Sequence, residues 1–193
     1  MKKLVLATAL LFTAVSAFAQ APVRVRGTIT SLNGDVLAVK TREGRDVQLQ
    51  LPSDATVSTA KAMKLSDIKE GTYVGVTSVK GSDGKMVAKE VHLIPPQAPS
   101  GHMNWDLLPN SMMTNGNLSA PAQVGGGNEI TVKYKDGEQK ILVNAETAIV
   151  GFEPGTRADL KPGETIFATA RVEGDKFIAP RVNVSKGGVK PPQ

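Results

Sequence analysis

One short segment holds most of the side chains in this sequence that are suited to chemistry. Residues 101–113 contain one of the two histidines, three of the six methionines and the only tryptophan. Thioether sulfur and imidazole nitrogen suit Cu(I), and an aromatic face beside a bound cation adds a cation–π attraction. His102, Met103, Met112 and Met113 are therefore candidate ligands of copper, although their spacing matches no fixed metal motif.

A second hypothesis gives the same segment a packing role. Trp105, with Leu107 and Leu108, would fill a groove between two folded units, because a large amphipathic aromatic is a good interface filler. Asp106 would then cap the turn that follows it. Trp105 and Asp106 are also the candidate binding residues, and the sequence leaves the metal and packing hypotheses both open.

Motifs for other chemistry are missing from the sequence. It has no cysteine, which excludes disulfides, thiolate metal sites and a cysteine nucleophile. It has no glycine-rich phosphate loop, no Gly-x-Ser-x-Gly elbow and no His-Glu-x-x-His pair. The second histidine, His92, alternates with the apolar Val91 and Leu93, so we expect it to face solvent. We predict no catalytic residues and no enzymatic activity.

The first 19 residues resemble a secretory signal peptide. Met1-Lys2-Lys3 is basic, an apolar stretch follows, and Ala17-Phe18-Ala19 is a small-x-small cleavage site before Gln20. The apolar stretch is shorter than the roughly 20 residues that span a bilayer. Cleavage leaves 21 basic and 18 acidic side chains, a net charge of +3. We expect a periplasmic or secreted protein with no membrane span in its mature chain.

The mature chain contains an internal repeat. Val39–Gly44 matches Val132–Gly137, Ser66–Gly71 matches Ala158–Gly163, and Lys85–Val91 matches Lys176–Val182. These offsets of 93, 92 and 91 residues indicate two copies of one unit, since three matches in order rarely arise by chance. We expect domains at residues 22–94 and 112–186.

Each copy has the pattern of five β-strands. Residues 23–30 alternate between apolar and polar, and Asn33-Gly34-Asp35 is typical of a hairpin turn. In the first copy a short helical turn at 64–69 would separate the third strand from the fourth. The expected strands are 23–30, 36–40, 47–51, 73–79 and 86–94 in the first copy, and 114–119, 129–134, 139–144, 165–172 and 177–184 in the second.

The fold class that follows is all-β, with two tandem five-stranded OB-like barrels. Five strands with a helical insert after the third is the order of the OB fold, and closing a barrel removes aggregation-prone edges. A plain five-stranded β-sandwich is the alternative, which strand order alone does not exclude. A Pro-rich linker at 95–111 would join the two barrels, and residues 187–193 would form a flexible tail. We expect the barrels to pack as a rigid pair, because each is near the lower size limit for a self-sufficient core.

Five short phrases stand out along the mature chain: Val23–Ile29, Leu65–Gly71, Trp105-Asp106-Leu107, Met113-Thr114-Asn115 and Arg157–Gly163. Together they resemble a bacterial exported family of unknown function with tandem OB-like domains. Members often carry a label calling them permeases of metal transporters, which this sequence contradicts because it lacks the several membrane spans a permease needs. The resemblance implies that the 102–106 region belongs to the family pattern, and it implies no catalytic residues.

These observations favour an exported, non-enzymatic binding or accessory protein for an unknown periplasmic protein or small ligand. The alternative is a periplasmic Cu(I) carrier that uses the linker His/Met/Trp set. Nucleic acid is not an expected partner, because the mature chain has only six aromatic residues and a weak positive charge.

Overall fold

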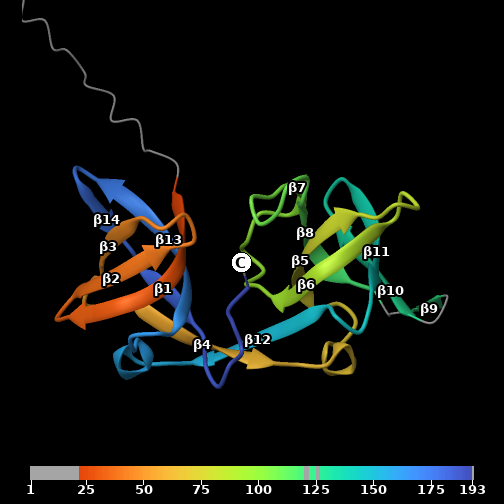
Figure 1. The fold of residues 1–193 in the computed structure, drawn as a ribbon. Helices are drawn as coiled ribbons and strands as arrows, with labels where there is room; N and C mark the ends of the chain where they lie inside the picture. The colour runs from red at the N-terminus through yellow and green to blue at the C-terminus, as the bar shows by residue number, and fades with distance from the viewer. Residues whose placement is uncertain (1–21, 120–121, 125–126, 193) are drawn as a thin grey trace, which may run out of the picture.

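A computed structural model describes residues 22–119, 122–124 and 127–192. The expected signal peptide at 1–19 lies outside the described residues. Within these ranges the chain folds as β-strands and two short 3-10 helices, so the all-β prediction is confirmed. Figure 1 shows two rounded groups of strands with β4 and β12 running between them and the C-terminus in the middle. Among the described residues, no helix is long and apolar enough to cross a membrane.

Strands cover both repeats and part of the linker. The first repeat (residues 22–94) contains β1 (Val23–Asn33), β2 (Val36–Thr41), β3 (Asp46–Gln50), β4 (Thr56–Ala62), β5 (Tyr73–Lys80) and β6 (Met86–Leu93). The linker (residues 95–111) contains β7 (Gly101–Asn104). The second repeat (residues 112–186) contains β8 (Met112–Leu118), β9 (Ala122–Val124), β10 (Gly127–Tyr134), β11 (Gly137–Val143), β12 (Ala148–Pro154), β13 (Thr165–Glu173), β14 (Lys176–Ile178) and β15 (Arg181–Val184).

Five strands close into a barrel, which we call the first ring. Its pairings run β1–β2, β2–β3, β3–β14, β14–β13 and back from β13 to β1. Alternation turns one side chain in two toward the interior, where Ile29, Leu37, Leu49 and Ile166 are almost completely buried. The closed pairing leaves no unpaired edge within the ring.

A second group of five strands, which we call the second ring, also pairs in a cycle. Its pairings run β5–β6, β6–β11, β11–β10, β10–β8 and back from β8 to β5. Its buried apolar residues, among them Val74, Val76, Ile130 and Ile141, form a cluster separate from that of the first ring. The molecule therefore has two cores, each enclosed by its own strands.

Neither ring is built from one continuous repeat. The first ring takes β1, β2 and β3 from the first repeat and β13 and β14 from the second, while the second ring has the reverse composition. This arrangement differs from the expectation that 22–94 and 112–186 would each close a barrel. The cause is β4, which pairs with β15 beside the first ring and then with β12, so it carries the chain across to the second ring.

The pairing of β4 with β12 shows how the two repeats are related. Ser66 matches Ala158 in the sequence repeat, so Ala60 and Phe152, each six residues earlier, are counterparts. These two residues are paired directly in the antiparallel β4–β12 ladder. A strand that meets its own counterpart in this way lies on a two-fold axis. The repeats are thus arranged like a strand-exchanged dimer joined in one chain.

Equivalent glycines give independent support for this relation. A side chain at Gly27 would collide with the carbonyl oxygen of Lys40, and one at Gly116 would collide with that of Lys133. Lys40 and Lys133 are counterparts in the repeat. Each glycine therefore allows the same close approach of backbone in its own ring.

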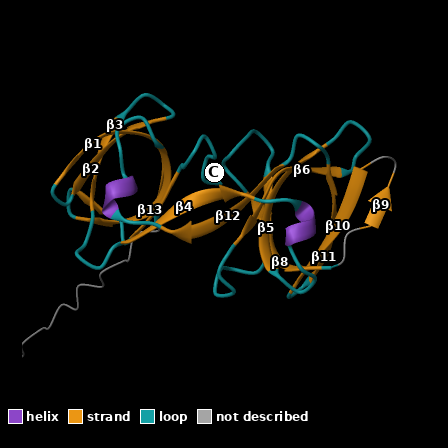
Figure 2. Cartoon of the chain, turned by 90° about the horizontal axis from the view of Figure 1, so that it is seen from below, coloured by secondary structure: helices purple, strands orange, loops and turns teal. Residues whose placement is uncertain are grey.

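The expected helical turn at 64–69 is present as a single 3-10 turn. It spans Leu65–Asp67, and a second one at Arg157–Asp159 occupies the matching place in the other repeat. Asp67 and Asp159 each accept a hydrogen bond from the backbone N–H three residues earlier, at 2.8 Å. Figure 2 shows one helix beside each rounded group of strands.

Candidate functional site

The candidate residues of the linker lie on a hairpin formed by β7 and β8. His102 pairs with Thr114 and Met103 with Met113. The His102 Nδ1 lies 2.8 Å from the Thr114 hydroxyl oxygen. Partial burial lowers the pKa of His102, so this imidazole is neutral near pH 7.

The hairpin register separates the four candidate copper ligands. Directly paired residues in an antiparallel ladder point to the same face, and neighbours along a strand point to opposite faces. Met103 and Met113 therefore share one face, whereas His102 and Met112 share the other. Among the described residues, no cluster of three or more His, Cys, Asp or Glu could hold a metal ion. The hairpin does not bring the predicted soft-metal set together.

Trp105 and Asp106 lie in the loop at the tip of this hairpin, and Ser111 fixes the shape of the loop. The Ser111 hydroxyl oxygen lies 3.0 and 2.9 Å from the carbonyl oxygens of Trp105 and Leu108, and its single proton is shared between these two acceptors. It also accepts from the Leu108 N–H at 3.1 Å, and the Trp105 N–H donates to the Ser111 carbonyl at 2.9 Å. These hydrogen bonds close the loop on itself.

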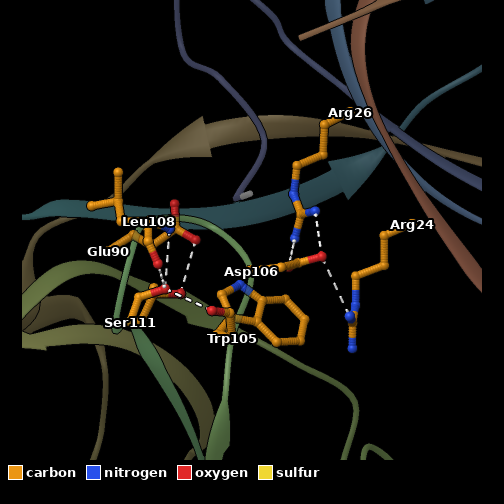
Figure 3. Close-up of polar contacts among 8 residues, drawn as sticks. Arg24, Arg26, Glu90, Trp105, Asp106, Leu108 and Ser111 are labelled. Atoms are coloured by element: carbon orange, nitrogen blue, oxygen red, sulfur yellow. Dashed lines mark hydrogen bonds and ion pairs between the residues drawn. The ribbon is translucent and has the colours of Figure 1, made fainter. Parts of the chain in front are cut away.

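The loop reaches across to two arginines on β1 of the first ring (Figure 3). Arg26 donates two hydrogen bonds to the Asp106 carboxylate, at 2.7 and 3.2 Å, and Arg24 lies 3.5 Å from the same group. The Arg24 guanidinium stacks on Trp105, 4.1 Å from the ring centroid. Arg26 also lies 5.1 Å from the ring of Phe167. Trp105 thus contacts the first ring while its loop belongs to the second, but Trp105 is only half-buried and Leu108 is 43% exposed, so these side chains fill a groove only in part.

The two partners in this contact differ greatly in burial. The Arg26 side chain is 5% exposed, but the Asp106 side chain is 51% exposed. The Arg26 Nε atom is buried and has no hydrogen-bond partner among the described residues. Burial alone raises the pKa of Asp106, but the Arg26 hydrogen bond and charge, helped by Arg24, lower the pKa overall. Asp106 is therefore ionised at neutral pH and balances a charge that is largely removed from water.

A small pocket opens beside these arginines at the end of the first ring. It has a volume of about 80 Å³ and lies between the start of β1, the β2–β3 turn and β14. Val25, Val47 and Phe177 supply apolar walls, and Val25 belongs to the buried core. Apolar walls with a few charged groups are typical of small-ligand sites, and this pocket is well below the roughly 300–1,000 Å³ usual for them, so it has room for only a small ligand group.

Arginines dominate the charge around this pocket. Arg24, Arg26, Arg42 and Arg45 line it, with Glu43 as the single acidic residue. The tight β2–β3 turn positions three of these side chains, since Gly44 takes a φ of 79° and closes the turn onto Thr41. A hydrogen bond from Thr41 is the largest cause that lowers the pKa of Glu43.

His92 does not face solvent, which corrects the expectation from the sequence. It does point away from the second core, as alternation requires, but it is 8% exposed. Gly75 lies opposite, and a side chain there would come within 2.7 Å of the His92 Nε2. Beside this face the linker packs onto the ring, where Asn115 donates to the Pro99 carbonyl. Burial lowers the pKa of His92 to about 4.

The two rings differ at the positions of the arginines. Because Gly27 and Gly116 are counterparts, Arg26 corresponds to Asn115 and Arg24 to Met113. The second ring therefore has an amide and a thioether where the first has two guanidinium groups. The Arg24–Arg26 pair is therefore a feature of the first ring that the second ring does not repeat.

The sequence indicated one side of this site and missed the other. Trp105 and Asp106 were candidates because of their unusual composition for a linker. Arg24 and Arg26 were not, because alternating charged residues on a strand usually form a solvated face. The available signal was an Arg-x-Arg pair on the first strand together with an acidic residue in a linker of otherwise apolar and neutral character.

Comparisons with known proteins give a family match for part of the chain. A family model described as "Domain of unknown function (DUF5666)" matches residues 26–92. That range covers most of the first repeat, from Arg26 to His92, and about a third of the chain. No curated protein and no solved structure matches.

Proposed function

We propose that this chain is an exported, non-enzymatic binding protein that takes an anionic ligand in the arginine-lined pocket of the first ring. The observation that carries the proposal is the pocket itself, with apolar walls and four arginines around it. A cationic rim stabilises a bound anion, and low-dielectric walls strengthen that attraction. The signal-like segment at 1–19 supports export.

We further propose that the two rings are OB-like barrels with exchanged strands. Each ring has five strands, and a 3-10 turn follows β4 or β12, where the OB order has its helical insert. The exchange of strands joins the two barrels firmly, because each ring contains strands of both repeats and neither ring can unfold without removing strands that belong to both. Such a scaffold holds a pocket in fixed geometry, and fold alone does not decide the ligand.

The test separates the charge of a ligand from its apolar part. Hexanoate carries both a carboxylate and a short apolar chain, hexanol carries only the chain, and inorganic phosphate carries only the charge. Isothermal titration of the mature protein should show binding of hexanoate that is at least about tenfold tighter than that of hexanol.

Two matched double variants assign this binding to the pocket. Arg42→Gln with Arg45→Gln should weaken hexanoate binding at least about tenfold, since both charges line the pocket. Arg181→Gln with Lys161→Gln removes the same charge from exposed positions elsewhere in the protein and should leave binding unchanged. Equal weakening in both variants, or no hexanoate binding in the wild type, would contradict the proposal.

A further inference from the structure

Arg24 and Arg26 line the pocket and at the same time hold the carboxylate of Asp106. We infer that this arginine pair recognises the carboxylates of an acidic peptide segment of a partner protein, and that Asp106 occupies the pair within the chain as a resident competitor. The inference rests on the proposed function, because the two arginines border the proposed ligand pocket. It adds the class of ligand and a means of regulating access.

The direction from which Asp106 approaches Arg26 supports its displacement by an external carboxylate. The Arg26 side chain is buried, whereas Asp106 is half exposed. The carboxylate therefore reaches the guanidinium from the solvent side. An external carboxylate can take the same path and replace Asp106 by rotation of one side chain, with no opening of either core.

The arginine pair has more donors than Asp106 uses. A guanidinium offers five N–H donors, and Asp106 accepts hydrogen bonds from only two of those of Arg26. Arg24 is 42% exposed and contacts Asp106 only at 3.5 Å. A ligand with two or more carboxylates would satisfy donors that one aspartate leaves unused.

The number of arginines favours a peptide over a single small anion. Arg24 and Arg26 follow each other on one face of β1, and Arg42 and Arg45 lie in the β2–β3 turn, where the Arg42 N–H donates to the Arg26 carbonyl oxygen at 3.2 Å. An extended segment with several acidic side chains can contact more than one of these four guanidinium groups. A resident carboxylate also competes at a high effective concentration, so only a multivalent ligand displaces it readily.

The position of Trp105 in the loop makes the displacement of Asp106 visible by fluorescence. Trp105 stacks on Arg24 next to Asp106 and is the only tryptophan in the protein. When Arg24 turns toward an external carboxylate, the indole loses this cation–π contact and its environment changes. Trp105 emission therefore reports on occupancy of the arginine pair.

The experiment compares two peptides without tryptophan, Glu-Phe-Asp-Phe-Glu and its amide analogue Gln-Phe-Asn-Phe-Gln, both blocked at their ends. Each is titrated into the mature wild type, Asp106→Asn and the control Asp136→Asn. The control removes an exposed aspartate from the β10–β11 turn. We expect Asp106→Asn to bind the acidic peptide at least about tenfold more tightly than the wild type and the control, because the competitor is removed. The amide peptide should bind none of them.

Each other outcome decides against the inference. Equal affinity of the wild type and Asp106→Asn would show that Asp106 is a structural brace and not a competitor. Phosphate binding as tightly as the acidic peptide would show that the pair takes any anion. If hexanoate still binds through Arg42 and Arg45 in these cases, the proposed function stands while this inference falls. If hexanoate fails as well, both fall.

A measurement on the wild type keeps the inference testable should Asp106→Asn unfold. Saturating acidic peptide should shift Trp105 emission in the unmodified protein, and the amide peptide should leave it unchanged. Circular dichroism of each variant establishes which proteins are folded. An acidic peptide that binds without any change in Trp105 emission would place its site away from the arginine pair.

Discussion

The burial of His92 predicts a defined dependence of stability on pH. Its pKa is lowered from 6.5 to about 4 in the folded protein, because burial disfavours the charged imidazolium. Between these two values the unfolded chain binds a proton that the folded chain excludes. The free energy of unfolding therefore falls as pH falls through this range. At 1.36 kcal/mol per pKa unit, the full loss is about 3 kcal/mol.

The measurable part of this loss lies between pH 7.5 and pH 5. Lower pH also protonates the paired carboxylates, such as Asp106 and Asp159, whose pKa values are lowered in the folded state. From pH 7.5 to pH 5 the His92 contribution is about 2 kcal/mol. His92→Asn should remove that part of the slope. Asparagine is the residue at the corresponding position of the second repeat, Asn183, so it suits this site.

Urea unfolding of both proteins across this pH range makes the comparison, with slopes rather than absolute stabilities as the readout. His102→Asn is the matched control, since His102 is only partly buried and should contribute less to the slope. Wild type and His92→Asn losing stability equally between pH 7.5 and pH 5 would refute the assignment of His92 as a buried neutral group.

Three further predictions concern the linker, the exchange and export. Trp105→Ala should lower the free energy of unfolding by about 2 kcal/mol, less than for a fully buried aromatic, as denaturant titration can check. The wild type should unfold in one transition by both circular dichroism and Trp105 fluorescence, since each ring needs strands of both repeats; two separate transitions would contradict the exchange. Intact-mass analysis of periplasmic material should give a mature chain that begins at Gln20, and a cytosolic chain that keeps Met1 would contradict export.

The repeat and most strands were predictable from the sequence because both depend on local patterns. Alternation between apolar and polar residues predicted β1, and the internal repeat predicted a second set of strands in the second copy. β4 and β12 were missed. Thr56–Ala62 is mostly small and polar, and β4 is paired with β15 and β12, whereas β12 is paired with β4 and β6, so both strands depend on partners distant in sequence. β4 and β12 carry the chain from one ring to the other. The sequence pattern therefore predicted most strands of each ring correctly but assigned them to barrels built from a single repeat.

The candidate site was predictable only where composition was unusual. A tryptophan in a linker signalled a contact, and Trp105 makes one. The partner of that contact depends on how the rings are arranged, which no local pattern encodes. His92 shows the same limit, because alternation gave its direction correctly, but the linker that covers this face is distant in sequence from the strand.

Binding in the pocket of the first ring is tested most directly by methyl NMR of the mature protein with hexanoate. Val25 and Val47 line the pocket, whereas Val74 and Val76 belong to the core of the second ring. Added hexanoate should shift the methyl signals of Val25 and Val47 in a saturable way and leave those of Val74 and Val76 unchanged. Shifts confined to the second ring, or no saturable shift at any concentration, would contradict the proposed binding site.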